Sequence, residues 1–112
     1  MERGRHSKAL DAFRIFVDRY PHHPLADDAL YYMAREALAL GRRKEALEAL
    51  NRLVESYPRG DRVSQAMLKM GLILVMEGRI KEGEEEIEKV LEGSPYTLGA
   101  QEVEALLKGE GR

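Results

Sequence analysis

The sequence contains no cysteine and no tryptophan, and only 6% of its 112 residues are aromatic. Without cysteine, a disulfide framework, a thiolate nucleophile and a cysteine-ligated zinc site are all excluded. The longest uncharged apolar run, Met70 to Met76, is far shorter than the roughly 20 residues that cross a bilayer as a helix. We therefore expect no membrane insertion in this segment.

The charges are numerous but balanced. The 18 basic and 20 acidic side chains leave a formal net charge of -2, with 34% of the residues charged. This balance gives no electrostatic reason to expect nucleic acid or an anionic membrane surface as a partner. Length and composition together predict one compact, charged, helical domain.

The chain repeats itself with a period of 37 residues. Pro21, Pro58 and Pro95 share this spacing. So do three glycines, each followed by arginine: Gly4, Gly41 and Gly78. Sliding residues 20–56 onto 57–93 gives ten identities, and most other matched positions keep their character. A repeat of this length is typical of stacked supersecondary units.

Each unit is predicted to form two helices. In the first unit, Pro24 suits the first helical position, and apolar residues then recur at steps of three and four until Gly41. A second helix is expected from about Arg43 to Ser56, closed by Tyr57-Pro58. The stripes on these two helices are Ala26, Ala29, Leu30, Met33, Ala34, Ala37 and Leu38, then Ala46, Leu47, Leu50, Leu53 and Val54.

The second unit repeats this plan, with Asp61 as the expected N-cap and Gly78 as the end of its first helix. The expected stripes are Met67, Met70, Gly71 and Leu74, then Ile80, Gly83, Ile87, Val90 and Leu91. A single helix over about 7–19 precedes the units, with the stripe Ala9, Phe13, Phe16 and Val17, and one over about 97–108 follows them. The sequence thus predicts an all-α chain of about six helices: a half repeat (5–20), two repeats (21–57 and 58–94) and a half repeat or cap (95–109).

These residues resemble the tetratricopeptide repeat, a helix–turn–helix unit with small residues where its helices touch. The resemblance implies an α-α superhelix. Gly83 stands where the family has alanine, and we expect this exchange to be conservative. The family's signature positions fall on Leu30, Met33, Ala34, Ala37, Gly41, Ala46, Leu50, Leu53 and Pro58 in the first unit.

The residue pattern of the repeat also resembles that of proteins of the bacterial cell envelope. In the first helix and the loop after it, the matching residues are Ala9, Phe13, Phe16, Tyr20 and Pro21. The likeness is to the C-terminal domain of the Tol-Pal-associated cell-division coordinator (YbgF-like) family, and outer-membrane assembly lipoproteins of the BamD type share it. Relative to the common repeat of 34 residues, three extra residues are expected to lengthen the helix that follows Tyr57-Pro58. The resemblance implies a periplasmic or envelope-associated scaffold.

The start of the chain carries a separate expectation. Gly4 aligns with the turn glycines Gly41 and Gly78, so the chain is expected to begin at a turn inside a repeat. A helix with an unpaired apolar face needs a preceding partner. We therefore expect a fragment excised from a longer array.

The resemblance implies that first helices line a concave groove for a protein or peptide partner. Carried over by position, the groove residues are Asp28, Tyr31, Tyr32, Arg35, Gln65, Leu68, Lys69, Leu72, Val75 and Met76, with Glu102 and Ala105 from the last helix. The helix around 63–76 is apolar nearly all round, so it is either buried on both sides or presents a binding face. Both alternatives stay open for Leu68, Leu72, Val75 and Met76.

Other polar groups have ordinary explanations. Adjacent His22 and His23 lie in a loop stiffened by Pro24 and lack the three convergent ligands of a metal site, so no metal is expected. We expect a solvated outer face for the acidic residues of the last full helix. They are Glu82, Glu84, Glu85, Glu86, Glu88 and Glu92. No phosphate-binding loop, metalloprotease motif or nucleophile elbow occurs. The sequence predicts no enzyme and no cofactor.

Three functions fit these observations. The first is a non-catalytic interaction scaffold of the cell envelope, coordinating Tol-Pal-type machinery during division. The second is a cytoplasmic scaffold or assembly chaperone that uses the same groove. The third is a self-assembling element, a homo-oligomer in which exposed terminal helices of two copies dock.

Overall fold

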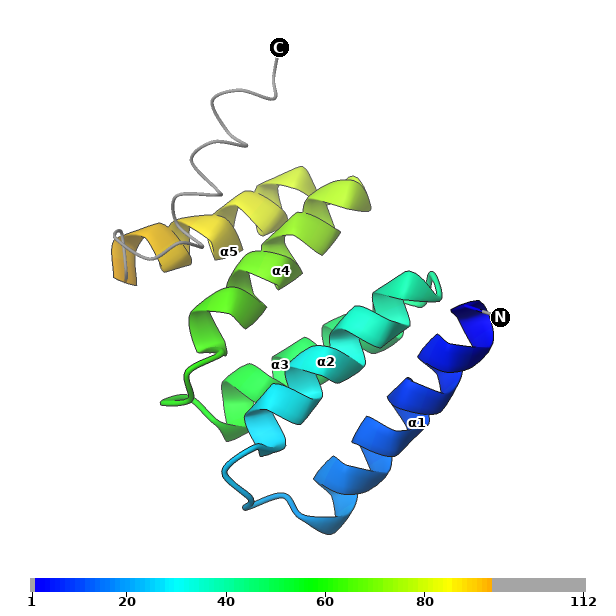
Figure 1. The fold of residues 1–112 in the computed structure, drawn as a ribbon. Coiled ribbons are helices and arrows are strands. Elements are labelled where there is room, and N and C mark those ends of the chain that lie inside the picture. The colour runs from blue at the N-terminus through cyan, green and yellow to red at the C-terminus, as the bar shows by residue number, and fades with distance from the viewer. Residues whose placement is uncertain (1, 94–112) are drawn as a thin grey trace. The chain divides into compact units, whose positions relative to one another are not determined.

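The computed structural model describes residues 2–93, which form five α-helices and, within that range, no strand. They are α1 (Glu2–Arg19), α2 (Ala26–Ala39), α3 (Arg43–Ser56), α4 (Val63–Met76) and α5 (Ile80–Gly93) (Figure 1). This confirms the predicted all-α helical repeat fold. The helix predicted over 97–108, with Glu102 and Ala105, lies outside the described residues.

The chain divides into two compact units, Met1–Val63 and Ser64–Arg112. In the first unit, α2 packs against both of its neighbours in sequence, α1 and α3. Figure 1 shows α2 running antiparallel to each of them. The second unit contains α4 and α5, and α5 turns back across α4. A helix flanked on two sides, as α2 is, can bury an apolar stripe wider than that of a helix at the edge.

The two glycine turns form as the sequence predicts. Gly41 and Gly78 have φ angles of 77° and 86°, in the left-handed region that glycine adopts without strain. After α2, the Gly41 N–H bonds to the Leu38 carbonyl, and the Arg42 N–H bonds to the Ala37 carbonyl at 2.8 Å. The same pair of bonds follows α4. Both helices therefore end in a Schellman motif, which satisfies carbonyls that the helix itself leaves unpaired.

Three predicted helix boundaries are wrong. Gly4 lies inside α1, which begins at Glu2 instead of near residue 7, so no turn forms there. Pro24 precedes α2, whose N-cap is Leu25. Asp61 is not an N-cap and the helix after Pro58 is not lengthened, because residues 58–62 form turns and α4 begins at Val63. A backbone hydrogen bond from the Gly60 N–H to the Tyr57 carbonyl closes one of these turns.

The core of the first unit follows the predicted stripes on α2 and α3, except that Leu38, Leu47 and Val54 are half-buried. On α1 the buried positions are Leu10 and Val17, whereas the predicted Ala9, Phe13 and Phe16 are only half-buried. The buried set is Leu10, Val17, Ala26, Ala29, Leu30, Met33, Ala34, Ala37, Leu40, Ala46, Ala49, Leu50 and Leu53. Alanine dominates where α2 meets its neighbours, which lets the backbones approach closely.

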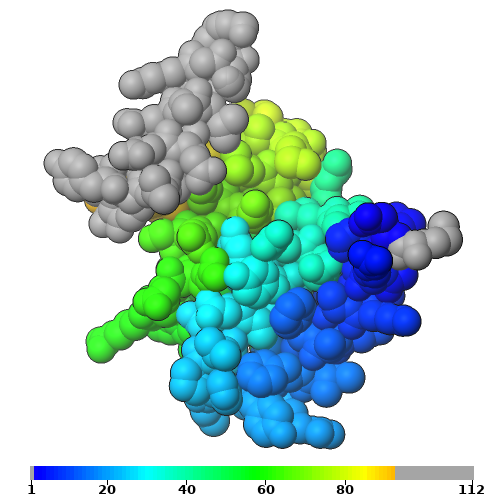
Figure 2. All heavy atoms as spheres, in the orientation of Figure 1, coloured from blue at the N-terminus to red at the C-terminus, as the bar shows by residue number. Residues whose placement is uncertain are grey.

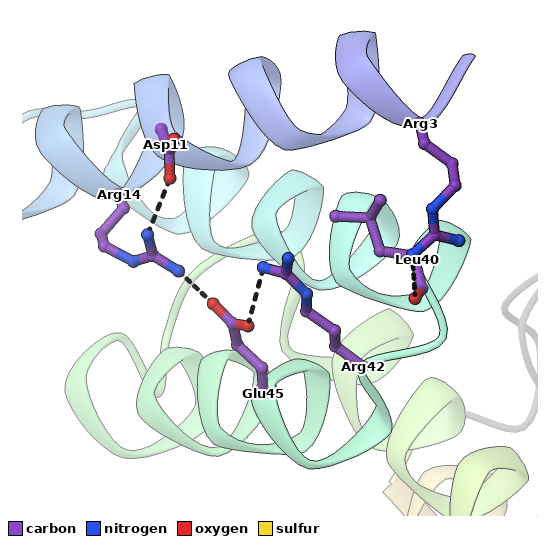
Figure 3. Close-up of polar contacts among 6 residues, drawn as sticks. All are labelled: Arg3, Asp11, Arg14, Leu40, Arg42 and Glu45. Atoms are coloured by element: carbon purple, nitrogen blue, oxygen red, sulfur yellow. Dashed lines mark hydrogen bonds and ion pairs between the residues drawn. The ribbon is translucent and has the colours of Figure 1, made fainter. Parts of the chain in front are cut away.

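Polar contacts join the helices of the first unit on one side (Figure 3). Arg14 reaches from α1 to Glu45 on α3 and also donates to Asp11 at 2.9 Å. Arg42 approaches the other oxygen of Glu45 at 3.6 Å. At the far end of α1, the Arg3 guanidinium donates to the Leu40 carbonyl at 3.5 Å, where α2 ends. A cation is favourable there because the helix C-terminus carries partial negative charge.

In the second unit, α4 and α5 approach through two glycines. A Cβ built on Gly83 would lie 2.6 Å from the Gly71 carbonyl oxygen, and one built on Gly71 would lie 2.9 Å from the Gly83 carbonyl oxygen. Both distances are shorter than real Cβ contacts allow. The expectation that alanine would be a conservative exchange at Gly83 is therefore wrong.

The core of the second unit also differs from the predicted stripes. Leu68, Ile87 and Val90 form a buried cluster, and Ile73 is 1% exposed. The predicted Met67 and Met70 are only half-buried, and Ile80 is 48% exposed. A helix that is apolar nearly all round gives periodicity no polar face from which to choose the buried one. Among residues 2–93, no helix has both the length and the apolar character to cross a membrane.

Candidate functional site

Four of the predicted groove residues lie together on α2. Asp28, Tyr31, Tyr32 and Arg35 follow one another at helical spacing, and Arg62 reaches them from the turn before α4. The Arg62 Nε donates to the Asp28 carboxylate at 2.7 Å, and its Nη2 donates to the Tyr32 hydroxyl at 2.9 Å. We call these five residues the Arg62 cluster.

Both tyrosine rings of the Arg62 cluster contact cations of the same cluster. The Arg62 guanidinium lies 4.9 Å from the Tyr31 ring centroid and 5.1 Å from that of Tyr32. Arg35 stands 5.4 Å from the Tyr32 ring, and Phe13 of α1 stacks on the same ring at 5.8 Å. The Tyr32 ring therefore contacts the Phe13 ring of α1 and the guanidinium groups of Arg35 and Arg62. Such cation–π contacts stabilise both the charge and the ring orientation.

The electrostatics of the Arg62 cluster favour a permanently charged guanidinium. The hydrogen bond to Asp28 raises the pKa of Arg62, and desolvation, which acts in the opposite direction, does not overcome it. The Arg62 side chain is 24% exposed and the Asp28 side chain 33%. The pair is therefore partly open to solvent, and both Asp28 and Tyr32 of the first unit hold the guanidinium by hydrogen bonds.

The other six predicted groove residues lie on α4 in the second unit. Leu68 is 7% exposed and belongs to the buried cluster with Ile87 and Val90, while Leu72 and Val75 pack against that cluster. For these three side chains the packing alternative accounts for the contacts seen. Gln65 is exposed, Lys69 is half-buried, and Met76 is 61% exposed. The groove as a whole stays a prediction.

A second feature of the first unit is an open apolar groove between α1 and α2, the two helices that lie side by side on the visible face of that unit (Figure 2). Its volume is about 470 Å³. It is lined by Ala12, Phe13, Phe16, Leu25, Asp28, Ala29 and Tyr32. Leu25 is 55% exposed. Only Asp28 contributes a charged group, so the groove suits an apolar occupant.

The histidine loop and the acidic helix have local partners. The His23 ring packs edge-on against Phe16 at 5.1 Å, and its Nδ1 accepts a hydrogen bond from the Leu25 N–H at 3.0 Å. In the part of the chain that the structure describes, no three metal-binding side chains converge. On α5, Glu82 pairs with Arg79 and Glu86 with Lys89, and the glutamates are exposed except for the half-buried Glu86.

Sequence reasoning missed Arg62 and the open groove. Arg62 lies in a turn, so a search for residues on helix faces does not find it. No sequence signal identified it, because Arg62 follows Asp28 by 34 residues and Tyr32 by 30, both short of the 37-residue repeat.

The antiparallel helix pairs, the two glycine turns and the 37-residue period define an all-α helical repeat protein. The model of the tetratricopeptide repeat family matches residues 1–61 and again residues 31–96. The chain therefore belongs to the tetratricopeptide repeat family. Repeats of this family mediate protein–protein interaction and typically act as non-catalytic scaffolds. No curated protein matches this sequence.

Proposed function

We propose that this protein is an interaction scaffold that binds a segment of a partner protein across the α2 face of its first unit, with the Arg62 cluster as the anchor. The observation that carries the proposal is the arrangement of Tyr31, Tyr32 and Arg62, in which two rings and a guanidinium are held in fixed contact but remain open to solvent. Tyrosine and arginine are the residue types that dominate binding energy at interfaces.

Pre-organisation supports this role. The Arg62 Nε and Nη2 are already bonded to Asp28 and Tyr32, and Phe13 holds the Tyr32 ring. These side chains have already lost most of their rotamer freedom before a partner binds. Binding therefore costs less side-chain entropy, and more of the interaction energy contributes to affinity.

The same surface indicates the chemistry of the bound segment. Arg35 is exposed and contacts the Tyr32 ring, and it makes no ion pair with any residue in the range 2–93. A carboxylate on the partner would pair with its guanidinium. The segment we propose therefore combines an acidic group with an apolar side chain that packs on Tyr31.

The test compares affinity capture from native cells by three versions of the protein. Tyr31→Ala and Arg35→Glu each change the proposed surface, and Asn51→Ala on α3 is the matched control at an exposed helical position. We expect mass spectrometry to find partners that the wild type and Asn51→Ala retain and both surface variants lose. Retention of every partner by folded Tyr31→Ala and Arg35→Glu would disprove the assignment.

We further propose that the partner belongs to the bacterial cell envelope, in Tol-Pal-type coordination of division. This refinement is supported by the spacing of alanine, phenylalanine and the Tyr-Pro pair in the first helix and the loop after it, which resembles that of envelope proteins. Fractionation of native cells followed by blotting tests it. A periplasmic or envelope band supports the refinement, whereas a cytosolic band replaces it with a cytoplasmic scaffold or assembly chaperone.

A further inference from the structure

We infer that the segment after α3, residues 57–62, is a clasp that assembles the Arg62 cluster only while it lies against the start of α2, and that Gly60 is the positioning residue that lets it lie there. This inference rests on the proposed function and deepens it, because it names what regulates the partner-binding surface. The clasp and α2 both belong to the first unit.

The clasp touches two successive residues of α2. The Arg62 Nε donates to the Asp28 carboxylate at 2.7 Å. Gly60 lies against the carboxylate of Asp27, since a Cβ built on Gly60 would be 2.4 Å from the Asp27 Oδ2 and 3.3 Å from its Cγ. Gly60 and Arg62 are only two residues apart, so a backbone shift at Gly60 also moves the guanidinium.

Gly60 is needed for space and not for its backbone conformation. Among residues 2–93, the glycines with a positive φ angle are Gly41 and Gly78, so Gly60 is outside the left-handed region that favours glycine. A Cβ on Gly60 would also lie 3.1 Å from the Tyr57 carbonyl oxygen. Because real Cβ atoms do not come as close as 2.4 Å to another heavy atom, a side chain here displaces either the Asp27 carboxylate or the clasp.

The Asp27 carboxylate is not free to yield. Its Oδ1 accepts a hydrogen bond from the Asp28 N–H at 2.9 Å. This N–H lies in the first turn of α2, where backbone donors have no partner within the helix and negative charge is favourable. Rotating the carboxylate away from residue 60 would break this bond. We therefore expect a side chain at residue 60 to displace the clasp.

Comparison of equivalent positions shows that this glycine is not a general feature of the repeat. At the 37-residue spacing, Gly60 corresponds to His23 and Thr97, and Arg62 corresponds to Leu25. The loop after α1 thus has neither the glycine nor the guanidinium, whereas the clasp has both. Their joint presence is explained by the Arg62 cluster and not by the architecture that the repeats share.

The position of the clasp should regulate partner binding. When the clasp leaves α2, the Arg62 guanidinium also leaves the rings of Tyr31 and Tyr32, which it contacts at 4.9 and 5.1 Å. The surface that we propose for the partner is then incomplete. When only a fraction of the molecules has the competent surface, the apparent affinity falls in proportion to that fraction.

The test follows the Arg62 Nε–H of the whole chain by nitrogen-15 NMR, without any partner; Arg62→Lys, which lacks this group, identifies the signal. In the wild type we expect slow exchange with water, because this N–H is bonded to Asp28. Gly60→Val should lose that protection, and Gly60→Ala should lose part of it. Adding Asp27→Ala to Gly60→Ala removes the obstructing carboxylate and should restore protection.

Gly41→Ala is the matched control, because it strains a different turn and should leave the Arg62 signal unchanged. Circular dichroism checks that each variant is folded, and Gly60→Ala decides the question if Gly60→Val does not fold. An Arg62 signal that stays protected in the folded Gly60 variants would overturn the inference. Because no partner is present, that result would leave the proposed function standing.

The affinity capture described above tests the regulatory part. Gly60→Val should lose the same partners as Tyr31→Ala. Partners lost by Tyr31→Ala but retained by Gly60→Val would overturn the inference and leave the proposed binding surface intact. Retention of every partner by Tyr31→Ala would instead disprove the proposed function, and the NMR result would still decide whether the clasp assembles the cluster.

Discussion

The phenolic hydroxyl of Tyr57 donates a hydrogen bond to the backbone carbonyl of Pro21. The two residues are 36 positions apart, and each belongs to a Tyr-Pro pair that closes a helix of the first unit. The bond therefore ties the loop after α1 to the turn after α3. The equivalent residue Tyr20 is 51% exposed, and its ring packs against Phe16.

This contact predicts different consequences for two chemically identical substitutions. Tyr57→Phe removes the hydroxyl and leaves the Pro21 carbonyl without that donor, so we expect the free energy of unfolding to fall by about 1 kcal/mol. Tyr20→Phe, whose hydroxyl bonds to no residue in the range 2–93, should change it by much less. Urea denaturation of both variants checks the difference. Equal effects would show that the Tyr57 hydroxyl contributes nothing.

Gly41→Ala should destabilise the protein although there is room for the methyl group. Nothing lies within 4 Å of a Cβ at Gly41, so the whole cost comes from its φ angle of 77° and amounts to about 1–2 kcal/mol. Gly4→Ala is the matched control, since Gly4 also has open space but lies in a helix. Its variant should be unchanged or more stable by up to about 1 kcal/mol. Thermal denaturation measures both, and a Gly41→Ala protein as stable as the wild type would contradict the argument.

Gly71→Ala and Gly83→Ala should also destabilise, for a steric reason. Each new Cβ would press on the carbonyl oxygen of the facing glycine, at 2.9 and 2.6 Å respectively. Forcing α4 and α5 apart costs about 1–3 kcal/mol, which exceeds the gain in helix propensity from alanine. Urea denaturation measures the effect. Stabilisation by either substitution would mean that the two helices do not cross this closely.

The pKa of the Glu82 carboxylate should lie below the ordinary value for glutamate, because Arg79 is its partner. Both of its oxygens accept hydrogen bonds from Arg79, each at 2.8 Å, and these bonds lower the pKa of Glu82. Because the folded-state pKa is the lowered one, the stabilisation is present at neutral pH and is lost as the pH falls through that pKa. Titration of Glu82 by carbon-13 NMR should show the pKa rise in Arg79→Ala. Lys89→Ala, which removes the partner of Glu86, should leave the pKa of Glu82 where it is.

Helices and turns of this protein could be predicted from its sequence because their signals are local. The period of the alanines on α2, the stop at Gly41 and the Tyr57-Pro58 end of α3 each depend on a few neighbouring residues. The start of α1 was missed because Gly4 matches the turn glycines in register while lying in a helix. Repeat register alone does not determine backbone conformation.

Packing and the candidate site were harder to predict because they depend on where helices cross. On α4 the apolar residues leave no polar side, so the burial of Leu68 and Ile73 follows from the crossing geometry. The same crossing excludes a Cβ at Gly83. Arg62 enters its cluster from a turn, and its contacts with Asp28 and Tyr32 depend on how the turn after α3 folds back against α2.

Hydrogen bonds between the elements of the first unit join residues 30 to 37 positions apart. They are His6–Glu36, Arg14–Glu45, Arg52–Asp18 and Arg3–Leu40. The entropic cost of closing a loop grows only slowly with its length. A topology built from neighbouring pairs has a low contact order, which favours fast folding. The two helices that α2 packs against in the first unit, α1 and α3, both precede residue 64 in the sequence. During synthesis this unit can therefore acquire its native packing as soon as α3 has left the ribosome, before the rest of the chain is translated.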